Sequence, residues 1–118
     1  TEQDHPDRTA DPSLMEPLTA MVCRATPALF EGQVRALLGR PDASGQLAAI
    51  ACPTAVIVGR QDGWSPPAQH EAIAAAVAGA TLTVIEDCGH MATVERPQAV
   101  TAALEAWLRL DPQRSAPC

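Results

Sequence analysis

The sequence predicts an α/β fold, in which N-terminal helices precede a β-α-β unit with parallel strands and a C-terminal helix. Two observations carry this prediction. The first is a pair of short apolar, β-branched runs at 54–58 and 81–85, which are typical of strands buried on both faces of a parallel sheet. The second is the recurrence of apolar residues at helical spacing in 65–78 and 97–108, after each of these strands. With 118 residues, the chain has room for one small domain.

The N-terminal third divides into an arm and a helical segment. Residues 1–12 are polar and aperiodic and contain two prolines, so we expect a disordered arm. Over 13–39, apolar residues recur at helical spacing with an interruption at Thr26-Pro27, which predicts two helices separated by a break. Gly39 suits the left-handed residue that commonly ends a helix.

The remaining boundaries follow from turn residues. Residues 44–52 are expected to form a short helical turn or loop, and Pro53 suits the start of a strand because it has no N–H to donate to the ladder. Strand, helix and strand within about thirty residues form a unit with a right-handed crossover. We therefore expect one domain over 13–110, with its β-α-β-α part at 54–108, followed by a tail at 111–118.

Composition and charge exclude several function classes. Hydrophobic residues make up 47% of the chain and charged residues 19%, which is typical of a globular domain. Because the net charge is −6 and there is no basic stripe with interleaved aromatics, we expect no nucleic-acid partner. No apolar stretch approaches membrane-spanning length, and no signal-peptide pattern is present, so we expect no membrane association. The four cysteines lack the short paired spacings of metal or redox sites, which predicts reduced thiols, no metal, no cofactor and a cytoplasmic location.

Candidate functional residues follow the two predicted strands. In a parallel α/β sheet, functional groups collect in the loops that leave the carboxyl ends of the strands, here 59–64 and 86–91. Because the two strands should be neighbours, Asp62 in the first loop and His90 in the second can meet. A carboxylate bonded to one ring nitrogen fixes the tautomer of a histidine and stabilises the imidazolium that forms when the other nitrogen accepts a proton. The pattern therefore predicts an acid–base dyad.

Each of these residues also has a simpler interpretation. Asp62 precedes Gly63, and Asp-Gly is a common turn pair. His90, taken alone, fits an ordinary turn or surface histidine. Trp64 and Met91 closely follow the acid and the base, so they either line a pocket for an acyl or aromatic substrate or fill the ends of the loops.

From about Ile50 to Leu108 the sequence resembles the α/β-hydrolase family, through the motifs PTAVIVGRQD, TLTVIEDCGH and ERP in this order. The resemblance implies that Asp62, in the Gly-x-x-Asp after the first strand, is the acid that orients the histidine. It implies that His90, in the Cys-Gly-His turn, is the general base. The expected fold is then a partial α/β-hydrolase fold, in which 13–39 takes the place of the lid or core helices.

The family's nucleophile is missing from the sequence. In the family, a serine lies in a Gly-x-Ser-x-Gly turn well before the acid, and an earlier loop helps to build the oxyanion hole; neither pattern occurs in the 118 residues. Ser65 is a poor candidate, because the following Pro66 has no N–H to donate to an oxyanion. Cys88 lies in the same turn as His90 and should point elsewhere. We therefore expect the chain to be inactive alone.

The resemblance implies a C-terminal fragment of a hydrolase that acts on an ester, lactone or related bond of a small-molecule substrate and supplies the acid and base of a Ser-His-Asp triad. Two alternatives stay open: a non-catalytic assembly or binding module on the same scaffold, and an unrelated β-α-β small-molecule binder in which Asp62 and His90 are incidental. Because 54–58 would present an unpaired apolar edge, we expect a homo-oligomer or a complementing N-terminal half as partner.

Overall fold

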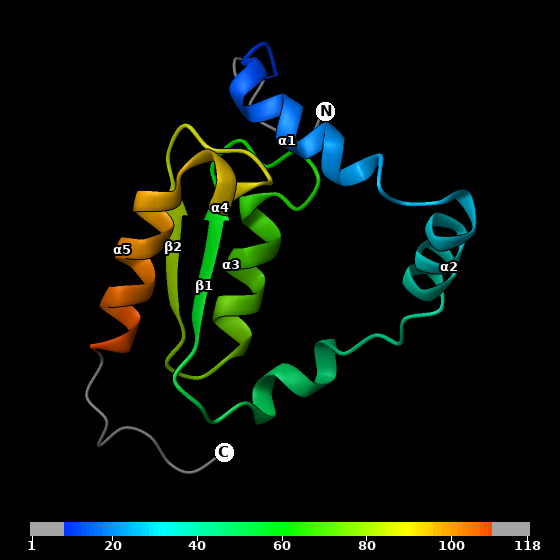
Figure 1. Ribbon diagram of the computed structural model, residues 1–118. Helices are drawn as coiled ribbons and strands as arrows, with labels where there is room; N and C mark the ends of the chain where they lie inside the picture. The colour runs from blue at the N-terminus through cyan, green and yellow to red at the C-terminus, as the bar shows by residue number, and fades with distance from the viewer. Residues whose placement is uncertain (1–8, 110–118) are drawn as a thin grey trace.

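The computed structural model describes residues 9–109, and its centre is a parallel two-stranded sheet of β1 (Ala55–Gly59) and β2 (Thr81–Ile85). The two strands pair over their whole length in matching order. They are connected by α3 (Pro67–Ala76), and Figure 1 shows the sheet between α3 and α5 (Pro97–Leu108). The α/β class, the parallel β-α-β unit and the C-terminal helix are therefore confirmed.

Two helices precede the sheet, with the expected break between them. The first, α1 (Pro12–Val22), is capped by the side chain of Asp11, and the second, α2 (Pro27–Leu38), follows Thr26. The Thr26 hydroxyl accepts a hydrogen bond of 3.2 Å from the N–H of Leu29, which satisfies a donor that the first helical turn leaves unpaired. Each helix also begins with a proline, whose missing N–H costs nothing at this position. In Figure 1, α2 stands apart from the sheet.

Several element ends differ from the expectation. The helix expected at 65–78 is shorter at both ends, and Gly79, with a φ of 75°, reverses the chain before β2. Gly39 ends α2 with a φ of −87°, so the expected left-handed conformation is wrong there. The turn expected before β1 is the 3₁₀ helix η2 (Ser44–Ala49), and α4 (Ala92–Glu95) is an additional helical turn that precedes α5. A single turn has no periodicity by which the sequence could have predicted it.

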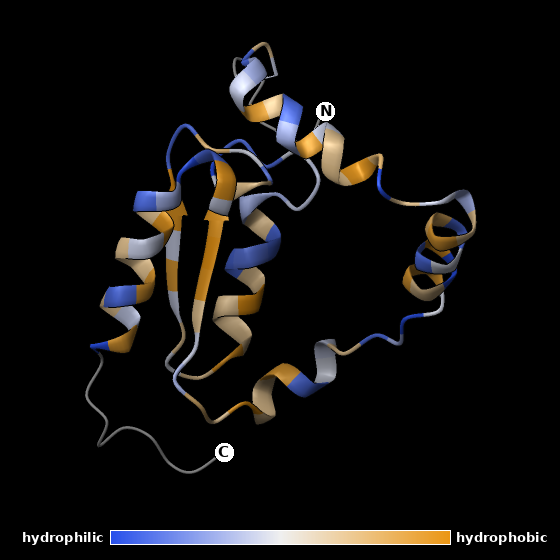
Figure 2. Ribbon diagram, viewed as in Figure 1, coloured by the Kyte–Doolittle hydropathy of each residue, from blue (hydrophilic) through white to orange (hydrophobic). Residues whose placement is uncertain are grey.

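The hydrophobic core lies between the sheet and its covering helices. In Figure 2, β1 is hydrophobic along its length. Trp107 of α5 donates a 3.2 Å hydrogen bond from its indole N–H to the carbonyl of Pro53, which ties the last helix to the start of β1. Apart from Leu14 of α1, the buried apolar side chains belong to the sheet, the connection before β2, the loop after it and α5: Val56, Val58, Val77, Ile85, Cys88 and Val100.

The strands are less buried than the sequence predicts. Burial on both faces was expected for each, yet the first two residues of β2 are exposed, including Leu82 at 36%. The reason is that the sheet of the described residues has only two strands, so little of its surface is covered beyond α3 and α5. Burial increases toward the carboxyl end of both strands, where the two candidate loops begin.

Several expectations concern cysteines, membranes and the chain ends. Cys23 and Cys88 are free thiols, whereas Cys52 is disulfide-bonded, so the expectation of uniformly reduced cysteines is wrong for Cys52, and the cytoplasmic location stays a prediction. Over residues 9–109, no helix combines the length and apolarity needed to cross a bilayer. Most of the arm expected at 1–12 and all of the tail at 111–118 lie outside the described residues, and the domain limits of 13–110 stay a prediction.

Candidate active site

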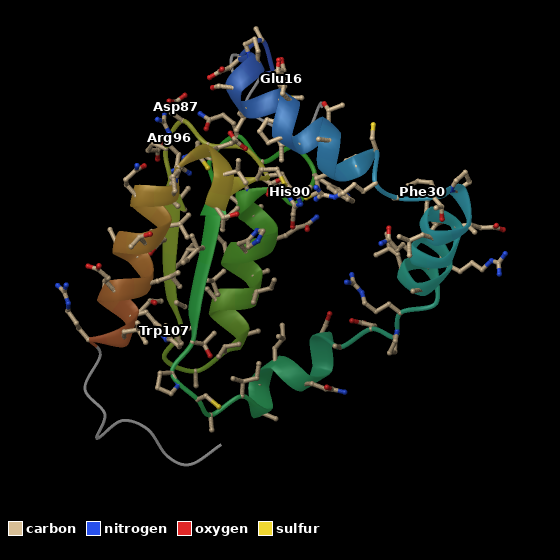
Figure 3. The ribbon with its side chains drawn as sticks, viewed as in Figure 1. Glu16, Phe30, Asp87, His90, Arg96 and Trp107 are labelled. Carbon is tan, nitrogen blue, oxygen red and sulfur yellow. The ribbon has the colours of Figure 1, made fainter. Side chains whose placement is uncertain are left out.

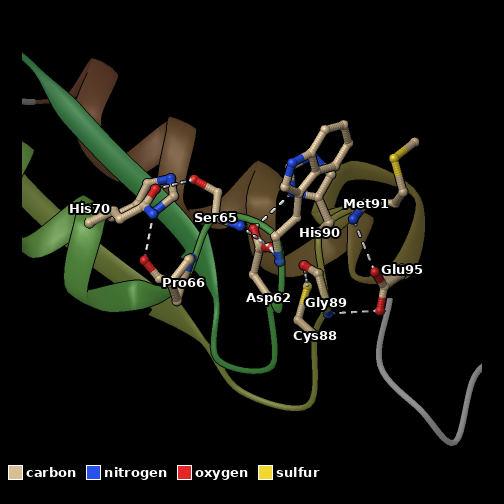
Figure 4. A network of polar contacts seen from close by, with 11 residues as sticks. Asp62, Ser65, Pro66, His70, Cys88, Gly89, His90, Met91 and Glu95 are labelled. Carbon is tan, nitrogen blue, oxygen red and sulfur yellow. Dashed lines mark hydrogen bonds and ion pairs between the residues drawn. The ribbon is translucent and has the colours of Figure 1, made fainter. Parts of the chain in front are cut away.

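Asp62 and His90 meet where the two strands end. Nδ1 of His90 lies 2.9 Å from Oδ2 of Asp62. Figure 4 shows the two side chains facing each other. The carboxylate side chain is only 5% exposed, whereas the imidazole is 34% exposed. Because an ionised carboxylate only accepts hydrogen bonds, this contact assigns the proton to Nδ1 and leaves Nε2 as the basic nitrogen. The predicted contact between the two side chains is confirmed, and their catalytic role stays a prediction.

The second oxygen of Asp62 organises its own loop. Oδ1 accepts hydrogen bonds from the backbone N–H groups of Trp64, at 3.0 Å, and Ser65, at 2.8 Å. The simpler interpretation of Asp62 as a turn residue is therefore also correct in geometry. The two interpretations are compatible, since the turn uses one oxygen and holds the other toward His90.

Trp64 and Met91, the two residues predicted to line a substrate pocket, differ in how they lie relative to His90. The indole of Trp64 lies beside the imidazole of His90, with ring centroids 4.9 Å apart and a tilt of 44° between the planes, and Trp64 is 59% exposed. The thioether of Met91 is directed away from the imidazole in Figure 4. Of the two, Trp64 is therefore the one that a molecule approaching His90 would meet, and the substrate-binding role of both stays a prediction.

The loop with Asp62 and the loop with His90 are joined by backbone contacts. Gln61 donates its N–H to the carbonyl of Cys88 at 2.8 Å, and its side-chain oxygen accepts the N–H of Cys88 at 2.9 Å. A Cβ atom on Gly59 would lie 2.3 Å from the carbonyl oxygen of Gly89, so only glycine allows the loops to approach this closely. The position of the acid and the position of the base are therefore coupled.

Glu95 is a residue at the site to which the sequence analysis assigned no role. It belongs to α4, is buried, and its carboxylate accepts hydrogen bonds from the backbone N–H groups of Gly89 and Met91, on either side of His90. Its signal in the sequence is the ERP motif, whose proline opens α5. Burying a carboxylate is costly unless it is hydrogen-bonded. If Glu95 had been predicted to be buried, a role in bonding the nearby backbone could therefore have been predicted as well.

Cys88 and Ser65 are the two residues considered as nucleophiles, and each side chain contacts groups other than His90. The thiol of Cys88 is fully buried and belongs to a core cluster with Ile85 and Val100. The hydroxyl of Ser65 lies 3.3 Å from the side-chain oxygen of Gln69 in α3. Over residues 9–109, no group of three or more His, Cys, Asp or Glu side chains is placed to hold a metal ion.

Comparisons with known proteins agree on one fold. The model of the "Alpha/beta hydrolase family" matches residues 3–104. A thermophilic esterase from Thermogutta terrifontis, solved with malate bound, is 33% identical, with a TM-score of 0.80 over 92% of this chain and 40% of that chain. No curated protein matches the chain.

Two further solved structures are similar in fold. An alpha/beta hydrolase enzyme from a Medee basin deep-sea metagenome library is 23% identical, with a TM-score of 0.76 over 93% of this chain and 43% of that chain. Est816, described as an N-acyl homoserine lactone degrading enzyme, is 23% identical, with a TM-score of 0.71 over 89% of this chain and 42% of that chain. The chain thus spans 40–43% of the length of these three structures.

Proposed function

Because the chain belongs to the alpha/beta hydrolase family, we propose that it supplies the acid, Asp62, and the general base, His90, of a hydrolase acting on an ester, lactone or related bond of a small molecule. The observation that carries this proposal is the 2.9 Å contact between His90 Nδ1 and Asp62 Oδ2. The esterase similarity at 33% identity supports the class of bond.

The proposed mechanism uses the two nitrogens of one imidazole. Nε2 of His90 accepts the proton of a nucleophile that approaches from outside this chain and later returns it to the leaving group. Asp62 stabilises the imidazolium formed in between, because its carboxylate is buried 2.9 Å from Nδ1. The neighbouring indole of Trp64 adds a cation–π attraction to the charged ring and would contact the substrate.

We further propose that the nucleophile is carried by a complementing N-terminal half with the family's serine turn. The chain spans 40% of the similar esterase, and its sheet of described residues has two strands. In addition, α2 has no buried residue, although most of its side chains are apolar. A partner that extends the sheet and covers α2 would bury this surface.

The proposal is tested in a chimera in which this chain replaces the matching 40% of the Thermogutta terrifontis esterase. We expect the chimera to hydrolyse a chromogenic ester and His90→Ala to lower kcat by about a thousandfold or more, since removal of a triad base disables the whole catalytic group. The control is His70→Ala, which removes an imidazole of α3 bonded to the carbonyl of Pro66. A folded chimera without activity, or with activity that survives His90→Ala, would contradict the proposal.

A non-catalytic assembly module is the second candidate, and the exposed apolar side chains of α2 favour it. This function would require partner binding but no proton transfer. Asp62→Asn, which leaves α2 unchanged, separates the two candidates. It should lower ester hydrolysis in the chimera if the dyad is catalytic, and if the chain is only an assembly module the chimera should show partner binding that Asp62→Asn leaves unchanged.

A further inference from the structure

The turn that carries His90 is held by two side chains that lie outside the proposed dyad. Figure 4 shows Glu95 bonded to the backbone on both sides of His90. We propose that Glu95 and Gln61 form a clamp, here called the His90 clamp, that positions the imidazole for proton transfer. The inference rests on the proposed function of the dyad and assigns positioning roles to two further residues.

Glu95 is the buried half of the His90 clamp. Its residue is 5% exposed, and its two carboxylate oxygens accept different backbone donors, Oε2 from Gly89 at 2.8 Å and Oε1 from Met91 at 3.1 Å. Hydrogen bonds to an ionised acceptor are roughly twice as strong as neutral ones. One carboxylate therefore holds the Cys88–Gly89 and His90–Met91 peptide groups, which lie on the two sides of His90.

Glu95 can act in this way because α4 is itself fixed to the start of the turn. Arg96 donates a 2.8 Å hydrogen bond from Nε to the carbonyl of Asp87 and forms an ion pair with the Asp87 carboxylate. Figure 3 shows the two side chains beside each other above α5. Asp87 has a φ of 53°, a conformation that L residues rarely adopt, so these contacts hold the chain in an otherwise unfavourable bend.

Gln61 is the exposed half of the His90 clamp. It holds Cys88 at two points, through its backbone N–H at 2.8 Å and its side-chain oxygen at 2.9 Å. Gln61 directly precedes Asp62, and Cys88 lies two residues before His90. The contact therefore fixes the acid and the base relative to each other.

The His90 clamp complements Asp62, which contacts only one atom of the imidazole. With Nδ1 held by Asp62 alone, the ring could still tilt about that contact, and the position of Nε2 would vary. Fixing the backbone on both sides of His90 removes this freedom. Because misplacement of a catalytic group by about 1 Å can cost on the order of a hundredfold in rate, the His90 clamp should matter for kcat more than for substrate binding.

The first test uses this chain alone and observes its imidazole rings by ¹⁵N NMR. In the wild type, we expect His90 to show one tautomer, with the proton on Nδ1. Glu95→Gln places an amide NH₂ against a backbone N–H, so we expect the His90 signals to shift toward a mixture of tautomers while those of His70 stay unchanged. The control is Glu105→Gln, which removes an exposed carboxylate of α5.

Gln61→Ala keeps the test decisive if Glu95→Gln does not fold, because Gln61 is exposed whereas Glu95 is buried. We expect a shift of the His90 signals in the same direction. In the esterase chimera, Glu95→Gln should lower kcat by about 10-fold to 100-fold with little change in KM, and Gln61→Ala by about tenfold. Unchanged His90 signals in a folded Glu95→Gln or Gln61→Ala variant would overturn the inference. A chimera that is inactive although the His90 signals depend on Glu95 would instead reject the proposed function and retain the His90 clamp.

Discussion

Gly59 is a position at which an added carbon atom would disturb the site. It is the last residue of β1 and is buried, and a Cβ there would lie 2.3 Å from the carbonyl oxygen of Gly89 and 2.4 Å from that of Cys88. Both neighbours are backbone atoms, which cannot rotate away as a flexible side chain can. The short distance between the two candidate loops therefore depends on the absence of a side chain.

We expect Gly59→Ala to lower the free energy of unfolding by about 3 kcal/mol, at the upper end of the usual cost of overpacking, because the loop with His90 must move. Urea denaturation followed by tryptophan fluorescence measures this. The control is Gly32→Ala in α2, where nothing lies within 4 Å of the added carbon, and the expected result is a gain of about 0.5–1 kcal/mol from helix propensity. Equal stability of Gly59→Ala and the wild type would contradict the close approach.

At the scale of the elements, an ion pair joins the ends of β1 and β2. Arg60 follows β1, and its guanidinium lies 2.7 Å from the carboxylate of Glu86, which follows β2. The hydrogen bond from Arg60 lowers the pKa of Glu86 below its ordinary value, and the same contact raises the pKa of Arg60. Because the pair is exposed, its effect on stability is small and salt-dependent, and its clearest consequence is the titration of Glu86.

Arg60→Gln should therefore raise the pKa of Glu86 toward the value of a free glutamate, as measured by ¹³C NMR of its carboxyl carbon. A lowered pKa in the folded state means that the contribution to stability is present above the unfolded-state pKa and is lost as the pH falls through the folded-state pKa. The variant should lack this acid-dependent loss. As control, Arg35→Gln removes the pair with Glu31 in α2 and should leave Glu86 unchanged. If the pKa of Glu86 is the same with and without Arg60, the pair does not form in solution.

At the scale of the whole molecule, the α/β part and α2 differ in how well they are covered. The sheet, α3 and α5 share a core, whereas α2 stands apart and carries several hydrophobic residues, as Figure 2 shows. Phe30, labelled in Figure 3, is 63% exposed. Leu37 lies two helical turns further along on the same face and is 53% exposed. Such a surface is typical of an interaction site.

We expect the isolated chain to self-associate through this face when no complementing half is present. Replacing Phe30 and Leu37 together with serine should weaken the association measured by sedimentation equilibrium at least about tenfold, since large apolar anchors each contribute about 1 kcal/mol or more. Gln33→Ser on the same helix is the control and should have no effect. A wild-type chain that remains monomeric and folds cooperatively would contradict this prediction.

Much of the fold and the position of the dyad could be predicted from the sequence, because the signals are local. The β-branched runs at 54–58 and 81–85 specify strands, Pro97 marks the start of α5, and Thr26-Pro27 marks the break between α1 and α2. Once the strands are recognised as parallel neighbours, their carboxyl ends must lie together. The proximity of the loops that carry Asp62 and His90 follows from this rule without any knowledge of side-chain packing.

The sequence by itself thus determined the α/β class, the order of the elements and the two loops that hold the dyad, because these depend on residue types at regular spacing. Only the tertiary structure decided that Glu95 is buried and bonded to the backbone on both sides of His90, that Gly59 contacts the opposite loop and that α2 stays uncovered. These features depend on which backbone groups and surfaces meet when distant segments pack. Such contacts cannot be predicted from the periodicity of residue types along the sequence. The hydrogen bond from Gly89 to Glu95, for example, forms only because the fold brings its donor and its acceptor together.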